Sequence, residues 1–174
     1  MPLTTYTAGE VLTASSLNDN FAFAAASVAT AIFNETQANG TQGGSSTSGS
    51  YIKRTLNTTV VNDIVGCSIA SSVITLPAGT YNVSAFSTFY AGTNCSIKLR
   101  NTTDSTDAIL GQSSQNGGNF VSNIPLLGTF TSIASKDYEL QYQVALSSAT
   151  FGLGIATSFG NDEIYSIIRI DKVA

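Results

Sequence analysis

From residue 51 onward, short segments rich in β-branched and aromatic residues alternate with turn signals roughly every 8–12 residues. The turns include Pro77-Ala-Gly79, and apolar and polar residues alternate clearly from Tyr81 to Ser87. The expected strands are residues 51–57, 62–69, 72–76, 80–91, 94–101, 107–111, 119–131, 137–146, 151–158 and 163–172. About ten antiparallel strands predict a mainly β chain folded as a jelly-roll sandwich.

The last of these segments is apolar on both of its faces. Residues 164–170 read Ile-Tyr-Ser-Ile-Ile-Arg-Ile, which departs from the alternation of a half-exposed strand. We therefore expect this strand to lie in the middle of a sheet, with one face toward the sandwich core. A neighbouring protomer would cover its other face.

Residues 1–37 carry a different pattern, that of an α-helix. Thr13 or Ser15 can cap the helix, and Asp19 places negative charge in its first turns. The apolar residues of the main stripe, spaced alternately by four and three, are Leu17, Phe21, Ala24, Val28 and Ala31. This repeat predicts a helix that packs against other helices, and an overlapping stripe extends it to Ile32.

A stretch of low complexity separates the two patterns. Residues 38–50 consist almost wholly of Gly, Ser, Thr, Asn and Gln. Such a composition predicts a flexible linker. We therefore expect three parts: an N-terminal α-helical segment at 1–37, a Gly/Ser linker at 38–50 and a β-head at 51–174.

Charged residues are few, and they exclude two classes of partner. The chain has 7 Lys and Arg and 11 Asp and Glu, with a net charge of −4. Because binding to phosphate groups needs clustered basic residues, we expect no nucleic-acid partner and no binding to an anionic membrane surface. The apolar run 21–33 is shorter than the roughly 20 residues needed to cross a bilayer. No basic residue precedes it, so we expect neither membrane insertion nor an export signal.

Residues that usually carry catalysis or bind metals are also scarce. The chain has no His, which removes the commonest general base and the commonest metal ligand. Cys67 and Cys95 cannot form a zinc site alone, and they are either two buried strand residues or a disulfide. The carboxylates within 104–107 and at 162–163 are interpreted as solvated loop residues, with calcium binding left open. We expect no enzymatic activity and no cofactor.

The N-terminal segment resembles one found near the N-termini of phage fibre and tail-appendage proteins. Residues 6–21 show an aromatic residue, a Gly three positions later, then Leu-Thr-Ala, Leu-Asn and a Phe. In that family the segment leads into a helix and docks the appendage to the particle. The resemblance and the helical repeat together assign virion docking and the helix seam to Tyr6, Gly9, Leu12, Leu17, Phe21, Val28 and Ile32, of which Val28 and Ile32 rest on the repeat alone.

The β-rich part is similar to the C1q/TNF-like jelly roll, which trimerises through a flat inner sheet. The segments that carry this similarity are residues 54–57, 74–83, 98–101, 136–140 and 163–169. The terminal Phe-x-Gly-x-Leu signature of C1q heads is only faintly echoed at Phe159-Gly160-Asn161, and no collagen-like stalk is present, which favours a viral version of the fold. The resemblance implies a homotrimer. The residues that would line the trimer interface, or else pack in the core, are Tyr90, Phe130, Tyr142, Phe151, Tyr165 and Ile167.

These observations favour a structural virion protein, namely a phage fibre or spike subunit exposed on the particle surface. It would dock by its N-terminus to another virion protein, such as a tail, portal, adaptor or capsid protein, and use a trimeric head for host attachment. Loops at the outer end, including 112–119, would contact a host glycan or protein. Two alternatives stay open: a capsid decoration or head-fibre protein and, from another class, a soluble C1q/TNF-like or lectin-like binding module.

Overall fold

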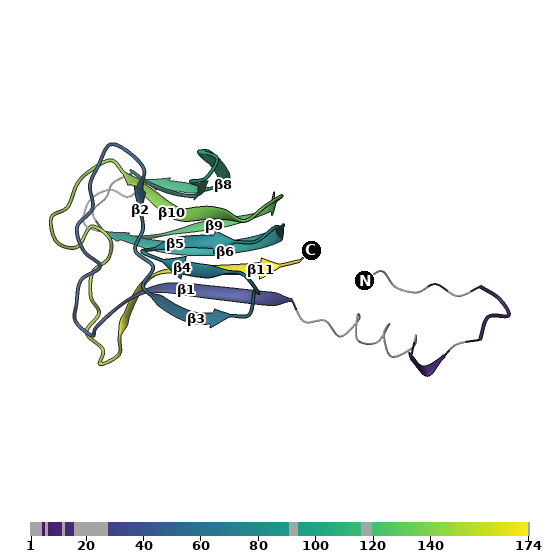
Figure 1. Ribbon diagram of the computed structural model, residues 1–174. Helices are drawn as coiled ribbons and strands as arrows, with labels where there is room; N and C mark the ends of the chain where they lie inside the picture. Colours follow the sequence, from purple (N-terminus) through teal and green to yellow (C-terminus); the bar gives the residue numbers. More distant parts are fainter. Residues whose placement is uncertain are drawn as a thin grey trace.

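The computed structural model describes Thr5 and residues 7–11, 13–15, 28–90, 94–115 and 120–173. Its body is a sandwich of two antiparallel sheets (Figure 1). The strands in these ranges are β1 Ala29–Gln37, β2 Ile52–Lys53, β3 Thr58–Asn62, β4 Ser68–Ala70, β5 Val73–Leu76, β6 Gly79–Tyr90, β7 Asn94–Asn101, β8 Thr106–Gln115, β9 Val121–Ser132, β10 Lys136–Val144 and β11 Glu163–Lys172. The predicted class, a mainly β jelly roll of antiparallel strands, is confirmed.

The first sheet has the strand order β3-β1-β11-β6-β9, and the second has the order β4-β5-β10-β7-β8, with β2 paired to β10. The last strand, β11, lies between β1 and β6, so its predicted central position is confirmed. β1 begins and β11 ends at the same end of the sandwich, which we call the entry end. Loops 38–50 and 145–162 gather at the opposite end, which we call the loop end (Figure 1).

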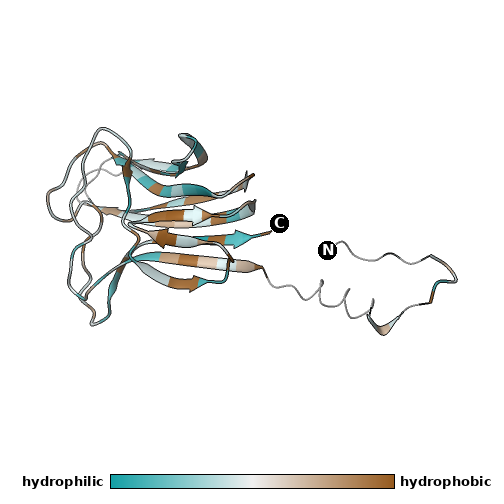
Figure 2. Ribbon diagram, viewed as in Figure 1, coloured by the Kyte–Doolittle hydropathy of each residue, from teal (hydrophilic) through white to brown (hydrophobic). Residues whose placement is uncertain are grey.

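Inward-facing side chains of both sheets fill a single core. Bands of hydrophobic residues cross β1, β6 and β11 (Figure 2). The ring of Phe130 lies between those of Tyr81 and Tyr138, with centroid distances of 5.5 and 4.9 Å. Phe89 and Tyr142 form a second aromatic pair, with centroids 5.9 Å apart. Burial of this apolar and aromatic surface is the main force that holds the two sheets together.

Both cysteines belong to this core as free thiols. Cys67 precedes β4 and Cys95 lies in β7, and both side chains are buried. Burial raises the pKa of each thiol to about 11. The structure confirms two buried free cysteines instead of a disulfide, although only Cys95 lies on a strand, as expected for both.

The predicted helix does not reach Ile32, because residues 29–37 form strand β1. β1 pairs with β11 on one side and with β3 on the other. Its side chains alternate, with Ala31, Phe33 and Glu35 in the core and Ile32 on the solvent side. The preceding Ala-rich run fits a helical repeat as well as a strand repeat, so it concealed this alternation.

The other residues assigned to the helix seam have varied positions. Val28 is an exposed residue immediately before β1. Gly9 has a φ of +96° and lies in a turn in which the N–H of Glu10 donates to the carbonyl of Thr7 at 3.1 Å. Tyr6, Leu12, Leu17 and Phe21 lie outside the described residues, so the docking role of this segment stays a prediction.

Residues 38–50 fold against the sandwich, which corrects the predicted flexible linker. The N–H of Gly43 donates to the carbonyl of Gly154 at 2.9 Å, and Ser46 and Ser148 exchange two backbone hydrogen bonds of 2.9 and 3.0 Å. A Cβ atom at Gly152 would collide with the Ser46 hydroxyl, so the chains approach this closely only with glycine there. The small residues of this stretch serve close backbone packing. The β-head therefore begins at β1 and not at residue 51.

Of the predicted strand 51–57 only residues 52–53 form a strand, β2, and two other predicted strands also differ from the observed ones. Residues 151–158 form a loop instead of a strand, and Gly154 in this loop has a φ of +140°. The predicted strand 62–69 is divided between the end of β3 and β4, with a turn between them at 63–67. In both places glycines break the extended backbone that the apolar residues had suggested.

Candidate interaction surfaces

The solvent side of the first sheet carries large apolar side chains in register across neighbouring strands. Ile167 in β11 lies opposite Phe86 in β6, which lies opposite Pro125 in β9. Phe86 is 43% exposed and Ile167 is 38% exposed. Two residues further along β9, Leu127 is 70% exposed. We call the surface formed by Ile32, Phe86, Pro125, Leu127 and Ile167 the apolar face.

The other side chains on this side of the first sheet mostly end in hydroxyl or amide groups. Thr129 Oγ1 donates to Asn82 Oδ1 at 2.7 Å. Arg169 and Asp171 form an ion pair of 2.9 Å, and Thr30 Oγ1 donates to the same carboxylate at 2.6 Å. Because these two charges offset each other, the solvent side of the first sheet carries little net charge.

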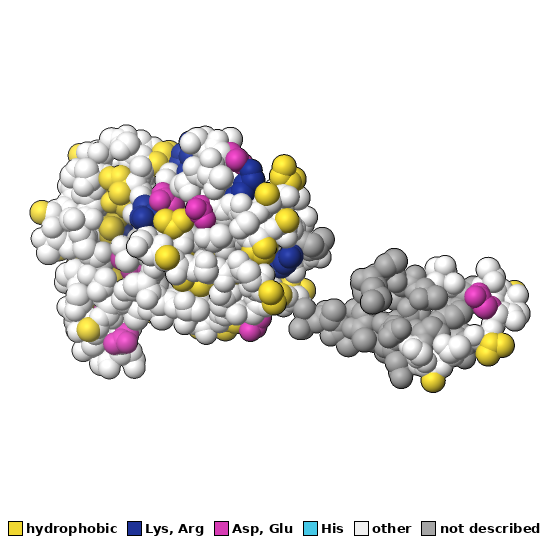
Figure 3. Space-filling model, in the orientation of Figure 1, with side chains coloured by type: hydrophobic (Ala, Val, Ile, Leu, Met, Phe, Trp, Pro, Cys, Tyr) yellow, Lys and Arg dark blue, Asp and Glu magenta, His cyan; other side chains and the backbone are white. Residues whose placement is uncertain are grey.

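The second sheet has the opposite character, because its solvent side is rich in ion pairs. The Asp107 carboxylate in β8 accepts hydrogen bonds from Lys98 Nζ at 2.9 Å and from Arg100 Nη1 at 2.8 Å. These hydrogen bonds lower the pKa of Asp107. Further pairs join Lys53 to Glu139 and Lys136 to Asp104. Most charged side chains visible on the sandwich in Figure 3 lie over its upper part, near β8 and β10.

These contacts also place the carboxylates that the sequence had left open for calcium. Asp104 and Asp107 are each paired with basic side chains. Within the described ranges, no three His, Cys, Asp or Glu side chains lie close enough to form a metal site. Nor does any helix in those ranges have the length and apolar character to span a membrane.

A buried ion pair joins the first sheet to the loop end. Arg54 Nε lies 2.6 Å from Glu35 Oε2, and both side chains are almost wholly buried. Arg54 Nη2 also donates to the carbonyl of Leu153 at 2.5 Å, and its guanidinium lies over the ring of Phe89. Burial outweighs the attraction of Arg54 and raises the pKa of Glu35 to about 7. The pair fastens β1 to the segment after β2 and to loop 145–162.

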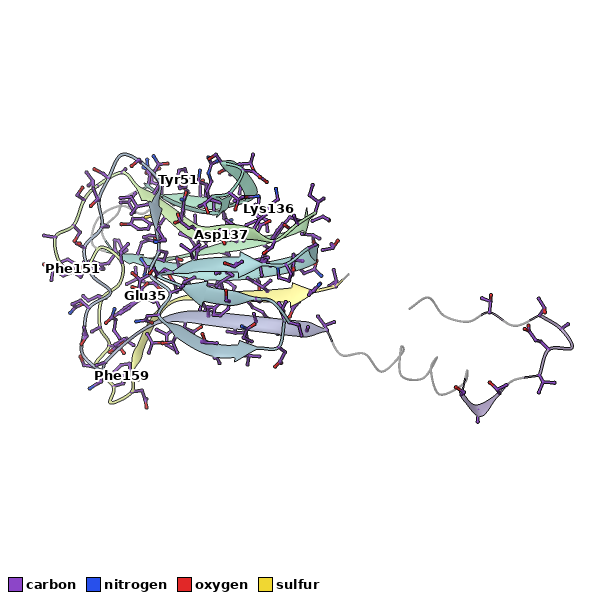
Figure 4. The ribbon with its side chains drawn as sticks, viewed as in Figure 1. Glu35, Tyr51, Lys136, Asp137, Phe151 and Phe159 are labelled. Carbon is purple, nitrogen blue, oxygen red and sulfur yellow. The ribbon has the colours of Figure 1, made fainter. Side chains whose placement is uncertain are left out.

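A second carboxylate organises a turn at the loop end. The Glu163 carboxylate accepts hydrogen bonds from the backbone N–H groups of Gly40, Thr157 and Ser158, at 3.3, 3.1 and 2.8 Å. These hydrogen bonds lower the pKa of Glu163. The turn holds Phe159 at its tip, where the side chain is 85% exposed. Phe151 and Phe159 both lie among the loops of this end (Figure 4).

The structure does not bring the six expected trimer-interface residues together. Tyr142 and Tyr165 are 3% and 4% exposed, so both are core residues of a single protomer. Phe130 packs in the aromatic stack of the core. Tyr90 and Phe151 contact each other at the loop end, with ring centroids 5.2 Å apart. Of the six, Ile167 alone lies on the apolar face.

Sequence reasoning missed Phe86 and Leu127, the two most prominent members of that face. β6 alternates between core residues and the polar residues Asn82, Ser84 and Thr88. Phe86 falls in the polar register of this strand. An aromatic residue in the outward register of an amphipathic strand was the available signal.

Known proteins match this chain by structure but not by sequence. No family model and no curated protein sequence matches the chain. The globular domain of zebrafish complement 1qA protein matches with a TM-score of 0.55 and 9% identity, covering 85% of this chain and 98% of that one. Murine APRIL at pH 5.0 matches with a TM-score of 0.57 and 7% identity, covering 84% of this chain and 100% of that one. This chain has the C1q/TNF-like jelly-roll fold. At such low identity the likeness concerns the fold alone.

Proposed function

We propose that this protein is a non-catalytic binding module that acts as a homotrimer and presents its loop end to a partner. The apolar face of the first sheet is the observation that carries the proposal. Large apolar side chains that are exposed in register across adjacent strands mark a surface that is covered in the working protein. The cover that we propose is two further copies of the same chain.

The size of the first sheet suits such a contact. Five strands about 4.8 Å apart, with the nine residues of β1 rising about 3.3 Å each, give a face of roughly 700 Å². A specific interface of standard size removes about 800 Å² from each partner. Around a threefold axis each copy shares part of this face with each neighbour, and the ring closes without leaving a free sheet face.

The charge distribution favours a copy of the chain over a charged partner. The first sheet presents one internally neutralised ion pair, Arg169 with Asp171, among its described outward side chains. Three such faces can meet without repulsion, whereas a strongly acidic or basic partner would find no opposite charge to match. The ion pairs of the second sheet would then cover the outside of the trimer and keep it soluble.

We further propose that the module belongs to a virion appendage, as a phage-type fibre or spike subunit. The support is the resemblance of residues 6–21 to the docking segment of such proteins, together with the direction of the chain. β1 starts at the entry end, so the chain enters the head at the end opposite the loop end. That arrangement suits docking at one end and host attachment at the other. A capsid decoration protein and a soluble binding module are the rival contexts.

Light scattering with mass determination on the full chain tests the assembly. We expect three times the 18.0 kDa of one chain over a wide range of concentrations, and a stable 18.0 kDa species would overturn the proposed trimer. Antibody labelling of particles by electron microscopy tests the context. Label on a tail or spike supports the appendage, label over the whole shell supports capsid decoration, and unlabelled particles support the soluble module.

A further inference from the structure

A hollow of about 510 Å³ opens at the loop end of the second sheet, where β7 begins and β8 and β10 end. This volume lies within the roughly 300–1,000 Å³ that is typical of small-ligand sites. Its described lining is mostly polar, with three small apolar residues: Asn94, Ser96, Ser113, Ser114, Gln115 and Gln143 together with Cys95, Val144 and Ala145. We propose that this hollow binds a neutral sugar. The inference rests on the proposed function, because it names the class of partner that the loop end would bind.

The side chains that line the hollow are set in register by strand pairing. Gln143 in β10 lies opposite Ser96 in β7, which lies opposite Ser113 in β8. Asn94 and Gln115 form the next pair on the same side of the sheet, because alternate residues of a strand share a face. The result is a polar surface across three neighbouring strands, which is more rigid than a surface made by loops alone.

Two of these side chains are fixed from outside the sheet. The hydroxyls of Ser96 and Tyr51 are hydrogen-bonded at 2.9 Å. Gln143 Nε2 donates to the carbonyl of Gly49 at 2.7 Å, which leaves its Oε1 available to accept. Residues 49–51 thus hold one side of the site in place before any ligand arrives, which lowers the entropy cost of binding.

The other polar groups are available to a ligand. The side chains of Asn94, Ser113 and Gln115 make no hydrogen bond to any residue in the described ranges. Hydroxyls and primary amides both donate and accept. A sugar presents the same mixture of donors and acceptors on neighbouring carbons, so its hydroxyls match this lining. A purely apolar ligand would leave these groups unsatisfied.

Charge restricts the ligand to a neutral one. None of the described residues that line the hollow is acidic or basic. The nearest basic side chain along β7, Lys98, is already engaged, with its Nζ 2.9 Å from Asp107 and 4.0 Å from the centroid of the Tyr51 ring. A phosphate or carboxylate ligand would therefore find no free positive partner in the site.

Saturation-transfer NMR on the full chain tests this inference with defined probes. The probes are methyl glycosides of glucose, galactose and mannose, free N-acetylglucosamine and, as a charged comparison, N-acetylneuraminic acid, each at about 10 mM because single sugars bind weakly. The variants are Ser96→Asp and Ser113→Asp, which place a carboxylate in the hollow. Ser68→Asp is the matched control, because Ser68 is an exposed serine on β4, the far edge strand of the same sheet.

We expect signal from at least one neutral probe, a loss of more than about fivefold in both site variants, and an unchanged signal in the control. Absence of signal from every neutral probe would overturn the inference. So would equal binding of the charged sugar, or signal that survives in both site variants. Because the mass of each variant is measured in the same samples, a failure of sugar binding is distinguishable from a failure of trimer assembly.

Discussion

The solvent sides of the two sheets differ in character: the first carries large apolar side chains, and the second carries ion pairs. Leu127 on the first sheet and Leu110 on the second are both 70% exposed. Leu127 belongs to a surface with Phe86 and Ile167, whereas Leu110 lies opposite Lys98 in a region of ion pairs. The exposed fraction of a single leucine therefore does not show whether the surface around it is covered in the assembly. The character of its neighbours indicates whether a surface is covered or wetted.

The largest expected effect comes from placing a charge on one face or the other. Leu127→Glu should abolish the proposed trimer, because three unpaired carboxylates would be buried in its interfaces. Leu110→Glu should leave assembly intact, since it adds one more charge to a surface that already has many. Light scattering on both variants measures the difference. Equal assembly of the two variants would contradict the proposal that the first sheet is buried in the trimer and the second is not.

The next largest effect concerns the ion pair that joins the first sheet to the loop end. Arg54→Ala should lower the free energy of unfolding by about 3–5 kcal/mol at about pH 8, because Glu35 would stay buried without its partner. The variant also loses the hydrogen bond to the carbonyl of Leu153. Urea denaturation measures the change, with Arg100→Ala as a control on the solvent side of the second sheet. A cost below about 1 kcal/mol would show that the pair does not hold the layers together.

The pH dependence of the same pair should be smaller. The pKa of Glu35 is about 7 in the folded chain and 4.5 in the unfolded one, so between these values the folded chain holds a proton that the unfolded chain has released. The stabilisation that comes from this bound proton is complete below pH 4.5 and is lost as the pH rises through 7. We expect the Tm of the wild type, relative to Glu35→Gln, to fall by a few degrees from about pH 5 to pH 8. A relative Tm that stays flat or rises would contradict the assigned pKa.

The smallest effect is expected on the charged side of the second sheet. Asp107→Asn should change the free energy of unfolding by less than about 1 kcal/mol, because its pairs with Lys98 and Arg100 are partly exposed and screened by solvent. It should leave the mass of the assembly unchanged. A change above about 2 kcal/mol in urea denaturation would mean that this sheet, too, depends on its surface contacts.

The sequence predicted the parts of the fold in which local pattern and tertiary environment agree. β6, β10 and β11 alternate or run apolar as their positions in the two sheets require, and all three were predicted. β1 was missed because alanine fits a helical and an extended repeat alike. Residues 38–50 were predicted wrongly because a composition of small residues fits either a flexible linker or close backbone packing. A loop more than 90 residues away in sequence decides between the two, as the pairing of Ser46 with Ser148 shows.

The candidate surface was less predictable for a related reason. Ile167 was expected at an interface and lies on the apolar face, whereas Tyr142 and Tyr165 proved to be core residues. An aromatic residue on a strand does not reveal which side of the sheet it faces until the register of its neighbours is known. Phe86 could have been found by its place among polar residues of β6. Leu127 could not, because β9 has apolar residues in both registers.

Thiol labelling measures most directly which face is covered. Leu127→Cys and Leu110→Cys would place a cysteine at two sites that are equally exposed in one protomer. The native Cys67 and Cys95 are buried, with thiol pKa values raised to about 11, so they contribute little background. In the native protein we predict that a maleimide reacts with Leu127→Cys far more slowly than with Leu110→Cys, and that the two rates become equal after unfolding. Equal rates in the native protein would contradict the claim that the first sheet is covered by copies of the chain.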